Sequence, residues 1–294
     1  MLSRLEATTN TLRIRFYTWG LKGASFKTWL KGFMAGNANM TAAVVVIGDE
    51  ILSGRTQDVN VAAIAKFLVP FGIDLAEVRI VPDREPEIVA AVNAVRARYT
   101  YVFTTGGIGP THDDITADAI GRAFDVPLEH HPEAMAMLGR RYAEGEFNER
   151  RQRMARVPEG ATLIKNPISV APGFQIGNVF VMAGVPKIMQ AMLDDVASRL
   201  ERGIPVISRS IRLKLPEGKI AAELAAIQDR YPELSIGSYP FFADFGAAGQ
   251  RAGSIGTTLV IRGRDAAAVN EAAEAVLAMA RAFGVEPEDE VRNS

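Results

Sequence analysis

Apolar residues along the first part of the chain form short continuous runs that alternate with longer helical repeats. Continuous runs at 42–47 and 99–105 predict buried strands, since a parallel strand covered on both faces needs no polar side. A third strand is expected at 75–81. Apolar residues spaced three and four apart indicate helices. These helices are predicted over 59–71, 86–98 and 117–124.

The order strand–helix, repeated three times, predicts an α/β fold with a doubly wound, mainly parallel sheet. Glu50, Asp83 and Asp114 each follow one of the predicted strands. Ligands of such sheets bind beyond the carboxyl ends of the strands. The pattern therefore places three acidic residues near one edge of the sheet.

The chain between this unit and residue 205 is expected to complete the same domain. Further strands are predicted near 163–164 and 179–182, and a helix over about 188–202. Residues 130–156 are polar and rich in arginine, and the spacing of Met135, Leu138 and Tyr142 supports a helix there. We interpret most of these arginines as a solvated face, with one or two available to meet substrate phosphates.

After residue 205 the pattern changes to alternation, at 207–215, which predicts a half-buried strand. A β-α-β-β-α order follows, typical of a small α+β domain for structure, substrate fit or oligomerisation. The expected domains are a basic leader (1–39), the α/β domain (40–205), the small domain (206–285) and a polar, frayed tail (286–294).

Composition restricts the class of protein. The chain has 294 residues, of which 48% are hydrophobic and 23% charged, as in soluble globular proteins. A formal net charge of −1 gives no field that would favour nucleic acid. The absence of cysteine excludes disulfides and thiolate metal sites. No apolar run approaches the ~18 residues of a membrane span, so we expect no transmembrane segment and a cytoplasmic protein.

Residues 1–39 differ from the rest of the chain. They contain both tryptophans and an excess of basic residues, namely Arg4, Arg13, Arg15, Lys22, Lys27 and Lys31 against Glu6. Three interpretations stay open: a start assigned upstream of Met40, a membrane-surface arm, or a transit-like peptide. Met40 directly precedes the first strand, which favours the first.

The glycine-rich segment 104–116, TTGGIGPTHDDIT, lies between a predicted strand and a helix. Glycine lets backbone approach a ligand, and a helix N-terminus offers free N–H groups to an anion. Two adjacent carboxylates would repel phosphate unless a cation lies between. The segment predicts a nucleotide or phosphorylated cofactor held with a divalent metal. Its phosphate-binding candidates are Thr105, Gly106, Gly107, Gly109, Pro110 and Thr111.

The same segment resembles the core motif of the MoaB/Mog-type molybdenum-cofactor biosynthesis superfamily. The closest resemblance is to the N-terminal domain of competence/damage-inducible protein CinA, and a similar domain occurs in eukaryotic FAD synthase. Three further motifs agree. They are GDEILSG at 48–54 with Asp58 and Asn60, Asn166 with APGF at 171–174, and GVP at 184–186.

The sequence departs mildly from the family pattern. Ala183 replaces a usual proline, and Ser169-Val170 replace usual small residues. The long C-terminal deamidase region of full CinA does not follow, so the resemblance does not extend to nicotinamide-mononucleotide deamidation.

The resemblance implies roles for particular acids. In the adenylyltransferase relatives two aspartates serve metal-dependent chemistry, and they match Asp83 and Asp114. Their oxygens suit Mg²⁺, Mn²⁺ or Co²⁺, with Asp113 as a further metal ligand. The alternatives are a helix N-cap for Asp114 and a plain turn residue for Asp83.

Other candidates carry more than one interpretation each. Glu50 is a metal ligand or a helix cap, Asp58 and Asn60 contact ligand or orient the loop, and Lys187 neutralises phosphate or is a surface lysine. His112 is a proton shuttle, a phosphate contact or a solvated residue. Gly48 and Gly173 complete the predicted ligand-binding set.

Three functions are compatible with these residues. The first, implied by the CinA-like resemblance, is hydrolysis of a pyrophosphate bond in a substrate such as ADP-ribose or FAD. The second is molybdopterin binding or adenylyl transfer, and the third is binding without catalysis. Asp113 and the extra domain favour the first. A small-molecule nucleotide or pterin phosphate and a second copy of the chain are the expected partners.

Overall fold

The computed structural model describes residues 39–242 and 255–292. The basic leader, apart from Asn39, therefore lies outside the described residues. No helix in the described ranges is long and apolar enough to cross a membrane.

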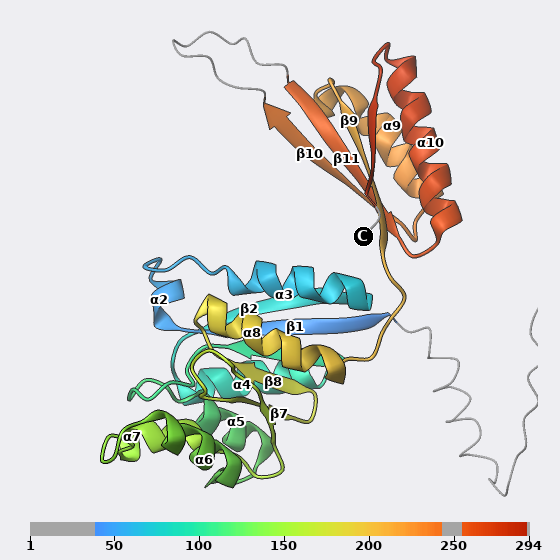
Figure 1. The fold of residues 1–294 in the computed structure, drawn as a ribbon. Helices are drawn as coiled ribbons and strands as arrows, with labels where there is room; N and C mark the ends of the chain where they lie inside the picture. The colour runs from blue at the N-terminus through green and yellow to red at the C-terminus, as the bar shows by residue number, and fades with distance from the viewer. Residues whose placement is uncertain (1–38, 243–254, 293–294) are drawn as a thin grey trace, which may run out of the picture. The chain divides into compact units, whose positions relative to one another are not determined.

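Within the described residues, six strands form the main sheet in the order β2-β1-β3-β8-β7-β6 (Figure 1). The neighbours β2, β1, β3 and β8 are parallel, whereas β7 and β6 are antiparallel. The predicted doubly wound, mainly parallel sheet is confirmed, with an antiparallel edge. The strands are β1 (Met40–Ile47), β2 (Ile73–Val81), β3 (Tyr101–Thr105), β6 (Thr162–Ile164), β7 (Gly173–Ile176) and β8 (Val179–Met182).

Helices cover both faces of this sheet (Figure 1). Side chains alternate across β1, so Val44 and Val46 pack in one core and Val45 and Ile47 in the other. Both cores are buried, which explains why the run at 42–47 carries no polar residue. The first core is covered by α3 (Asn60–Leu68) and α8 (Pro186–Val196), the second by α4 (Glu85–Arg96) and α5 (Thr116–Phe124).

Two predicted helices are shorter than expected. The helix predicted over 59–71 is α-helical to Leu68 and then becomes the 3-10 turn η2 (Val69–Phe71). Pro70 has no N–H to continue the α-helical ladder, and Gly72 ends the turn at a φ of 67°. Likewise, α8 ends at Val196 and passes into η4 (Ala197–Arg199).

The arginine-rich part of the chain forms a small unit between α5 and β6, here named the 128–158 segment. Its strands pair antiparallel, and Ala134, Leu138 and Ala155 form its own small core. Its elements are β4 (Leu128–His130), α6 (Pro132–Arg141), α7 (Glu149–Gln152), η3 (Arg153–Ala155) and β5 (Arg156–Pro158).

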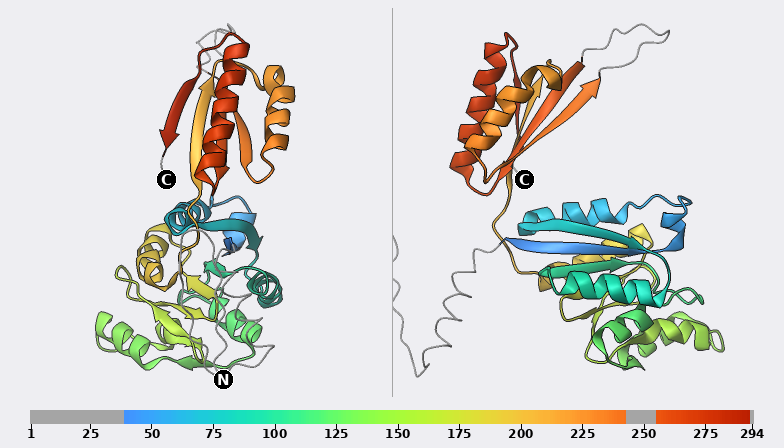
Figure 2. Two further views of the ribbon diagram at one scale, coloured as in Figure 1. Left: turned by 90° about the vertical axis from the view of Figure 1, so that its right-hand side faces the viewer. Right: turned by 180° about the vertical axis from the view of Figure 1, so that it is seen from behind.

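The C-terminal part forms the small α+β unit that the sequence predicts (Figure 2). Among the described residues, four antiparallel strands follow the order β10-β11-β9-β12, and two helices pack on their apolar side. Asp265 starts the longer helix by accepting from the N–H of Ala267 at 2.8 Å. The elements are β9 (Ile207–Leu213), α9 (Glu217–Arg230), β10 (Ser235–Phe242), β11 (Ile255–Gly263), α10 (Ala266–Ala282) and β12 (Glu288–Arg292).

The prediction of a frayed tail at 286–294 is wrong for residues 288–292. These residues form β12, whose backbone pairs with β9 from Glu288–Arg212 to Arg292–Ser208. An edge strand is held by backbone hydrogen bonds, which do not require apolar side chains. The acidic composition of the tail therefore gave no indication that a strand forms there.

Candidate functional site

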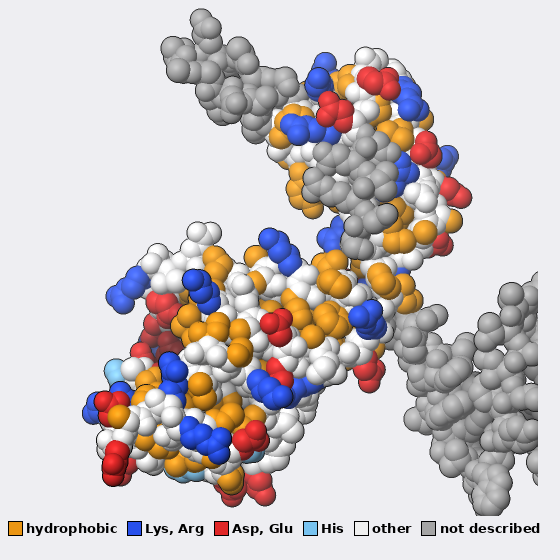
Figure 3. All heavy atoms as spheres, viewed as in Figure 1, with side chains coloured by type: hydrophobic (Ala, Val, Ile, Leu, Met, Phe, Trp, Pro, Cys, Tyr) orange, Lys and Arg blue, Asp and Glu red, His pale blue; other side chains and the backbone are white. Residues whose placement is uncertain are grey.

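A cleft of about 600 Å³ lies at the carboxyl ends of β1, β2, β3 and β8, where ligands of parallel sheets bind. Most of the predicted site residues line it, and acidic side chains gather next to α2 (Asp49–Leu52) in Figure 3. The predicted residues that line the cleft are Gly48, Glu50, Asp83, Gly106, Gly107, Gly109, Pro110, Asp113 and Asp114.

Backbone groups join the ends of β1 and β2 and bring their acids together. The N–H of Asp49 donates to Oδ2 of Asp83 at 2.9 Å, and the N–H of Gly48 donates to the carbonyl of Val81 at 3.1 Å. The Glu50 carboxylate folds back over Gly48, where a Cβ would stand 2.6 Å from its oxygens. Gly48 therefore makes room for the carboxylate that enters the cleft.

The environment of Asp83 disfavours its ionised form. Burial raises the pKa of its carboxyl above the ordinary value, and the neighbouring charges of Glu50, Asp49 and Asp113 act in the same direction. The N–H of Asp49 opposes them. A cation beside Asp83 would relieve this repulsion.

The glycine turn is fixed at both ends by hydrogen bonds. The N–H of Gly106 donates to the carbonyl of Met182 at 3.1 Å, which ties the turn to β8. The buried Thr116 donates its hydroxyl to the carbonyl of Gly106 at 2.9 Å and its N–H to the carbonyl of Gly107 at 3.0 Å. The turn is thereby held in place before any ligand binds.

The packing of the turn itself requires its glycines. Gly106 has a φ of 111°, and a Cβ there would lie 2.1 Å from the carbonyl oxygen of Ile47. A Cβ on Gly107 would lie 2.2 Å from the Thr116 hydroxyl, and one on Gly109 would lie 2.6 Å from Oδ2 of Asp114. These contacts explain the glycines without reference to a phosphate, and their role towards a ligand stays a prediction.

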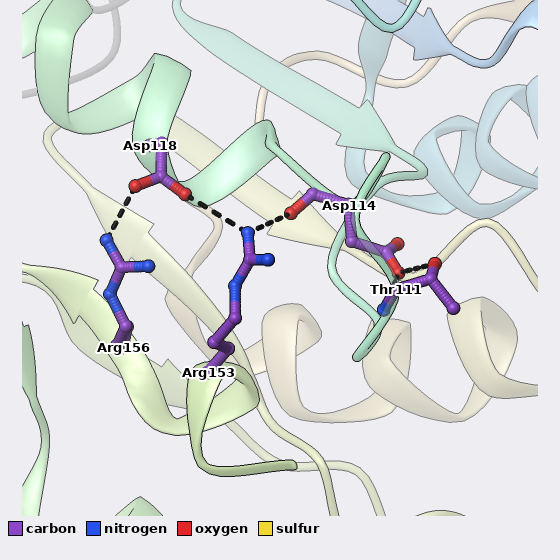
Figure 4. A network of polar contacts seen from close by, with 5 residues as sticks. All are labelled: Thr111, Asp114, Asp118, Arg153 and Arg156. Carbon is purple, nitrogen blue, oxygen red and sulfur yellow. Dashed lines mark hydrogen bonds and ion pairs between the residues drawn. The ribbon is translucent and has the colours of Figure 1, made fainter. Parts of the chain in front are cut away.

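Asp114 is held inside the turn and does not cap α5. Its Oδ2 accepts both the N–H of Thr111, at 2.8 Å, and the Thr111 hydroxyl (Figure 4). The N-cap of α5 is Ile115, and it makes no side-chain capping bond. The alternative of a helix cap for Asp114 is therefore wrong.

Arginines of the 128–158 segment reach the same turn (Figure 4). Arg153 donates from Nη2 to the backbone carbonyl of Asp114 at 3.4 Å and lies 3.9 Å from the carboxylate of Asp118. Arg156 pairs with the other oxygen of Asp118 at 2.6 Å. The segment is thus joined to the turn and to the start of α5.

Two of the predicted ligand contacts hold loops instead. Asn60 donates its amide to the carbonyl of Gly184 at 2.7 Å, and Asp58 accepts from the N–H of Val61 at 2.9 Å at the start of α3. Neither residue lines the cleft. The geometry favours the loop-orienting interpretation for both.

Four other predicted residues also lie outside the cleft lining. Thr105 is buried at the end of β3, and Lys187 is exposed in the first turn of α8. Gly173 lies in β7, where a Cβ would meet the carbonyl of Val181 at 2.3 Å, so strand packing explains this glycine. Thr111 lines an adjoining pocket and reaches the cleft through its bonds to Asp114.

Cleft residues from two later segments are not among those predicted from the sequence. Arg141, Tyr142 and Met154 come from the 128–158 segment, and Asn166 and Ser169 come from the loop before β7. Asn166 holds that loop, because its amide donates to the carbonyl of Ala171 at 2.7 Å and its oxygen accepts from the N–H of Ser169 at 3.1 Å. The excess of arginine at 130–156 was the available signal for Arg141.

The donor chemistry of the cleft fits a hard cation that also binds phosphate. Among the described residues, no three His, Asp or Glu side chains are placed to hold a metal ion by themselves. Mg²⁺, however, usually binds one or two carboxylates and completes its shell with water and substrate phosphates. The carboxylates of Glu50, Asp83, Asp113 and Asp114 line the cleft and suit that arrangement.

Comparison with known proteins matches both parts of the chain to described families. Residues 43–202 match a family described as probable molybdopterin binding domain, and residues 205–289 match one described as FAD synthase, middle domain. A protein of Pyrobaculum arsenaticum is 34% identical over 229 residues, which cover 74% of this chain and 83% of that protein.

Two relatives carry the CinA name. A CinA-like protein of Geobacter sp. is 37% identical over 204 residues, covering 67% of this chain and 49% of the relative, so the chain matches about half of that protein's length. The crystal structure of the protein CinA, of unknown function, from Thermoplasma acidophilum has 33% identity and a TM-score of 0.52, and covers 55% of this chain and 98% of that one.

Proposed function

The chain belongs to the molybdopterin-binding-domain family, in its CinA-like branch, and we propose that it hydrolyses a pyrophosphate bond in a nucleotide of the ADP-ribose or FAD class. One observation carries this proposal. The carboxylates of Glu50, Asp83, Asp113 and Asp114 face one cleft with the glycine turn. These carboxylates repel a diphosphate unless a divalent cation lies between the carboxylates and the phosphates. A divalent cation in that position also assists cleavage of a phosphate bond.

In the proposed reaction two aspartates have direct roles, and neighbouring residues orient them. Asp83 and Asp114 would hold the cation, which would supply charge neutralisation at the phosphate when bound. Asp83 is oriented by the N–H of Asp49, and Asp114 by Thr111. The water oxygen bonds to phosphorus and the bridging P–O bond breaks. ADP-ribose then yields AMP and ribose 5-phosphate, and FAD yields AMP and FMN.

The raised pKa of Asp83 suits this cation role. A carboxyl that is crowded by Glu50, Asp49 and Asp113 gains more from a nearby cation than an isolated one does. Cation binding should therefore release a proton from any Asp83 carboxyl that is still protonated. FAD is included among the substrates because residues 205–289 match a family described as FAD synthase, middle domain.

Molybdopterin binding or adenylyl transfer is the second candidate, and the description of the matched family favours it. The same cleft would serve, because both reactions place a pyrophosphate beside a divalent cation. Hydrolysis and adenylyl transfer differ in the acceptor of the adenylyl group, which is water in the first and a pterin phosphate in the second.

A single assay separates the candidates. Purified protein with Mg²⁺, Mn²⁺ or Co²⁺ is offered ADP-ribose, FAD, or molybdopterin with ATP, and AMP release or adenylylated pterin is measured. We expect AMP from ADP-ribose or FAD, reduced at least about 100-fold in Asp114→Ala and in Asp83→Ala. The control is Asp194→Ala, which alters an exposed acid on α8 outside the cleft.

Each other result has a definite meaning. Unchanged AMP release by Asp114→Ala would show that the proposed site is wrong. Transfer to the pterin without hydrolysis would select the second candidate, and saturable pterin binding without turnover would select binding alone. A homo-oligomer and a cytoplasmic location remain predictions.

A further inference from the structure

A second pocket, of about 500 Å³, adjoins the acidic cleft at Pro110, which lines both. Thr111 and His112 of the glycine turn form one side of it. The other side comes from the 128–158 segment, with Asn148, Arg150, Arg151 and Arg153. We name it the arginine pocket.

The two cavities have opposite charge. The acidic cleft is lined by four carboxylates and one arginine, Arg141. The arginine pocket is lined by three arginines, and the lining from the described residues includes no Asp or Glu. Arginine stays charged at any physiological pH, and its planar group suits the oxygens of a phosphate. Lys and Arg side chains over α6 and α7 are visible in Figure 3.

Two of the three arginines are fixed by neighbours. Arg151 donates to the carbonyl of Glu146 at 2.6 Å and to its carboxylate at 3.3 Å, and its guanidinium lies 4.3 Å from the ring centroid of Tyr142. Arg153 bridges the carbonyl of Asp114 and the carboxylate of Asp118. Each of these contacts uses part of a group that carries five N–H donors. These two arginines are therefore held in position, and the carboxylates of Glu146 and Asp118 offset their charge.

Arg150 differs from these two arginines because its guanidinium has no ion-pair partner among the described residues. Its side chain is exposed, and no described residue forms a hydrogen bond or ion pair with it. The helix that carries it is fixed at its start, where Asn148 accepts from the N–H of Arg151 at 3.1 Å. Arg150 is thus placed at the pocket with nothing in the described chain to neutralise it.

We propose that the arginine pocket binds a phosphate group of the substrate, with Arg150 supplying its available charge. This rests on the proposed function, since it assigns one phosphoryl group of a diphosphate to the acidic cleft and its cation, and the other to the arginine pocket. The two cavities adjoin each other, as the binding of two neighbouring phosphoryl groups of one diphosphate requires. Pro110 lines both cavities, and Thr111, in the arginine pocket, is bonded to Asp114 in the cleft.

The test is calorimetric binding of inorganic phosphate, which needs only the arginine pocket, to the full chain without metal at low salt. Arg150→Gln should weaken binding about tenfold, the usual effect of losing one hydrogen bond to a charged group. Arg150→Lys keeps the charge and should recover part of the loss. The matched control is Arg140→Gln, which removes an exposed arginine of α6 that lines neither cavity. Thermal melting confirms that each variant is folded.

The outcomes separate this proposal from the proposed function. Unchanged phosphate affinity in Arg150→Gln, an equal loss in Arg140→Gln, or no binding by the wild-type chain would overturn the subsite. Loss in Arg150→Gln by a protein that cleaves neither ADP-ribose nor FAD would keep the subsite and remove the hydrolase. Hydrolysis with kcat/KM unaltered by Arg150→Gln would keep the hydrolase and remove the subsite.

Discussion

Thr111 holds the carboxylate of Asp114 with two hydrogen bonds to the same oxygen. Its backbone N–H donates to Oδ2 at 2.8 Å, and its hydroxyl donates to that atom as well (Figure 4). The other oxygen, Oδ1, receives neither bond. Asp114 therefore has one oxygen that fixes its orientation and one that is available for a cation in the cleft.

Thr111→Val is expected to reduce cation-dependent activity about fivefold to tenfold. The substitution keeps the backbone bond and removes the hydroxyl, whose hydrogen bond to a charged group contributes about 1.5 kcal/mol. Thr111→Ser keeps the hydroxyl and should retain most of the activity. AMP release measured against Mg²⁺ concentration checks this. A Thr111→Val enzyme with wild-type metal dependence would show that the hydroxyl does not position Asp114.

Asp83→Asn is expected to stabilise the protein at neutral pH while removing activity. The folded-state pKa of Asp83 is raised, first by burial and then by neighbouring acids. Stability is therefore lost as pH rises from the ordinary value of about 4 through the raised value, and is regained when the charge is removed. The gain should stay below about 1 kcal/mol because solvent screens the partly exposed group.

Urea unfolding of Asp83→Asn at pH 7 and at about pH 3 measures this effect, which should fade at the lower pH because the carboxyl is protonated in both states. Glu77→Gln provides a control of opposite sign. The pKa of Glu77 is lowered by the Tyr99 hydroxyl and by Arg79, so its ionised form stabilises the fold and its loss should destabilise it at pH 7. Equal responses of the two variants would contradict the assignment.

Gly106→Ala should destabilise the protein by about 3 kcal/mol. Positive φ costs an L-residue about 1 kcal/mol, and the Cβ would also stand 2.1 Å from the carbonyl oxygen of Ile47. Gly145→Ala separates the two terms, because Gly145 has a φ of 82° with no atom within 4 Å of its Cβ position. Denaturant unfolding should show only the φ penalty there. A similar loss in both variants would rule out the clash.

Val170→Gly should stabilise the protein by about 1 kcal/mol. Val170 has a φ of 70°, a conformation that is strained for a β-branched residue. Glycine removes the strain. It also raises the conformational entropy of the unfolded chain, which offsets part of the gain in stability. Val170→Ala keeps a Cβ at positive φ and should gain less. Thermal unfolding of both variants decides the matter, and a lower melting temperature for Val170→Gly would mean that packing of the valine outweighs its strain.

Much of the fold followed from local pattern. The continuous run at 42–47 indicated a strand covered on both faces, and residues 42–47 are buried in β1. Glu50, Asp83 and Asp114 follow strands, and the parallel order of β2, β1 and β3 brings them to one cleft. Such inferences succeed because apolar periodicity and strand direction are properties of neighbouring residues.

Other features depended on contacts that are distant in sequence. The edge strand β12 is defined by pairing with β9, which no property of its acidic residues indicates. Asn60 shares the family motif with Glu50, yet it donates to Gly184, 124 positions away, instead of lining the cleft.

The sequence by itself determined the sheet, the glycine turn and the acids at the strand ends, because backbone geometry and side-chain periodicity are encoded locally. Only the tertiary structure decided the arginine side of the site. The 128–158 segment has its own small core, and Arg153 ties it to Asp114. That docking brings Arg141 to the acidic cleft and Arg150 to the arginine pocket. The sequence specifies that a residue is a charged arginine, but the packing of the chain determines which group that arginine faces.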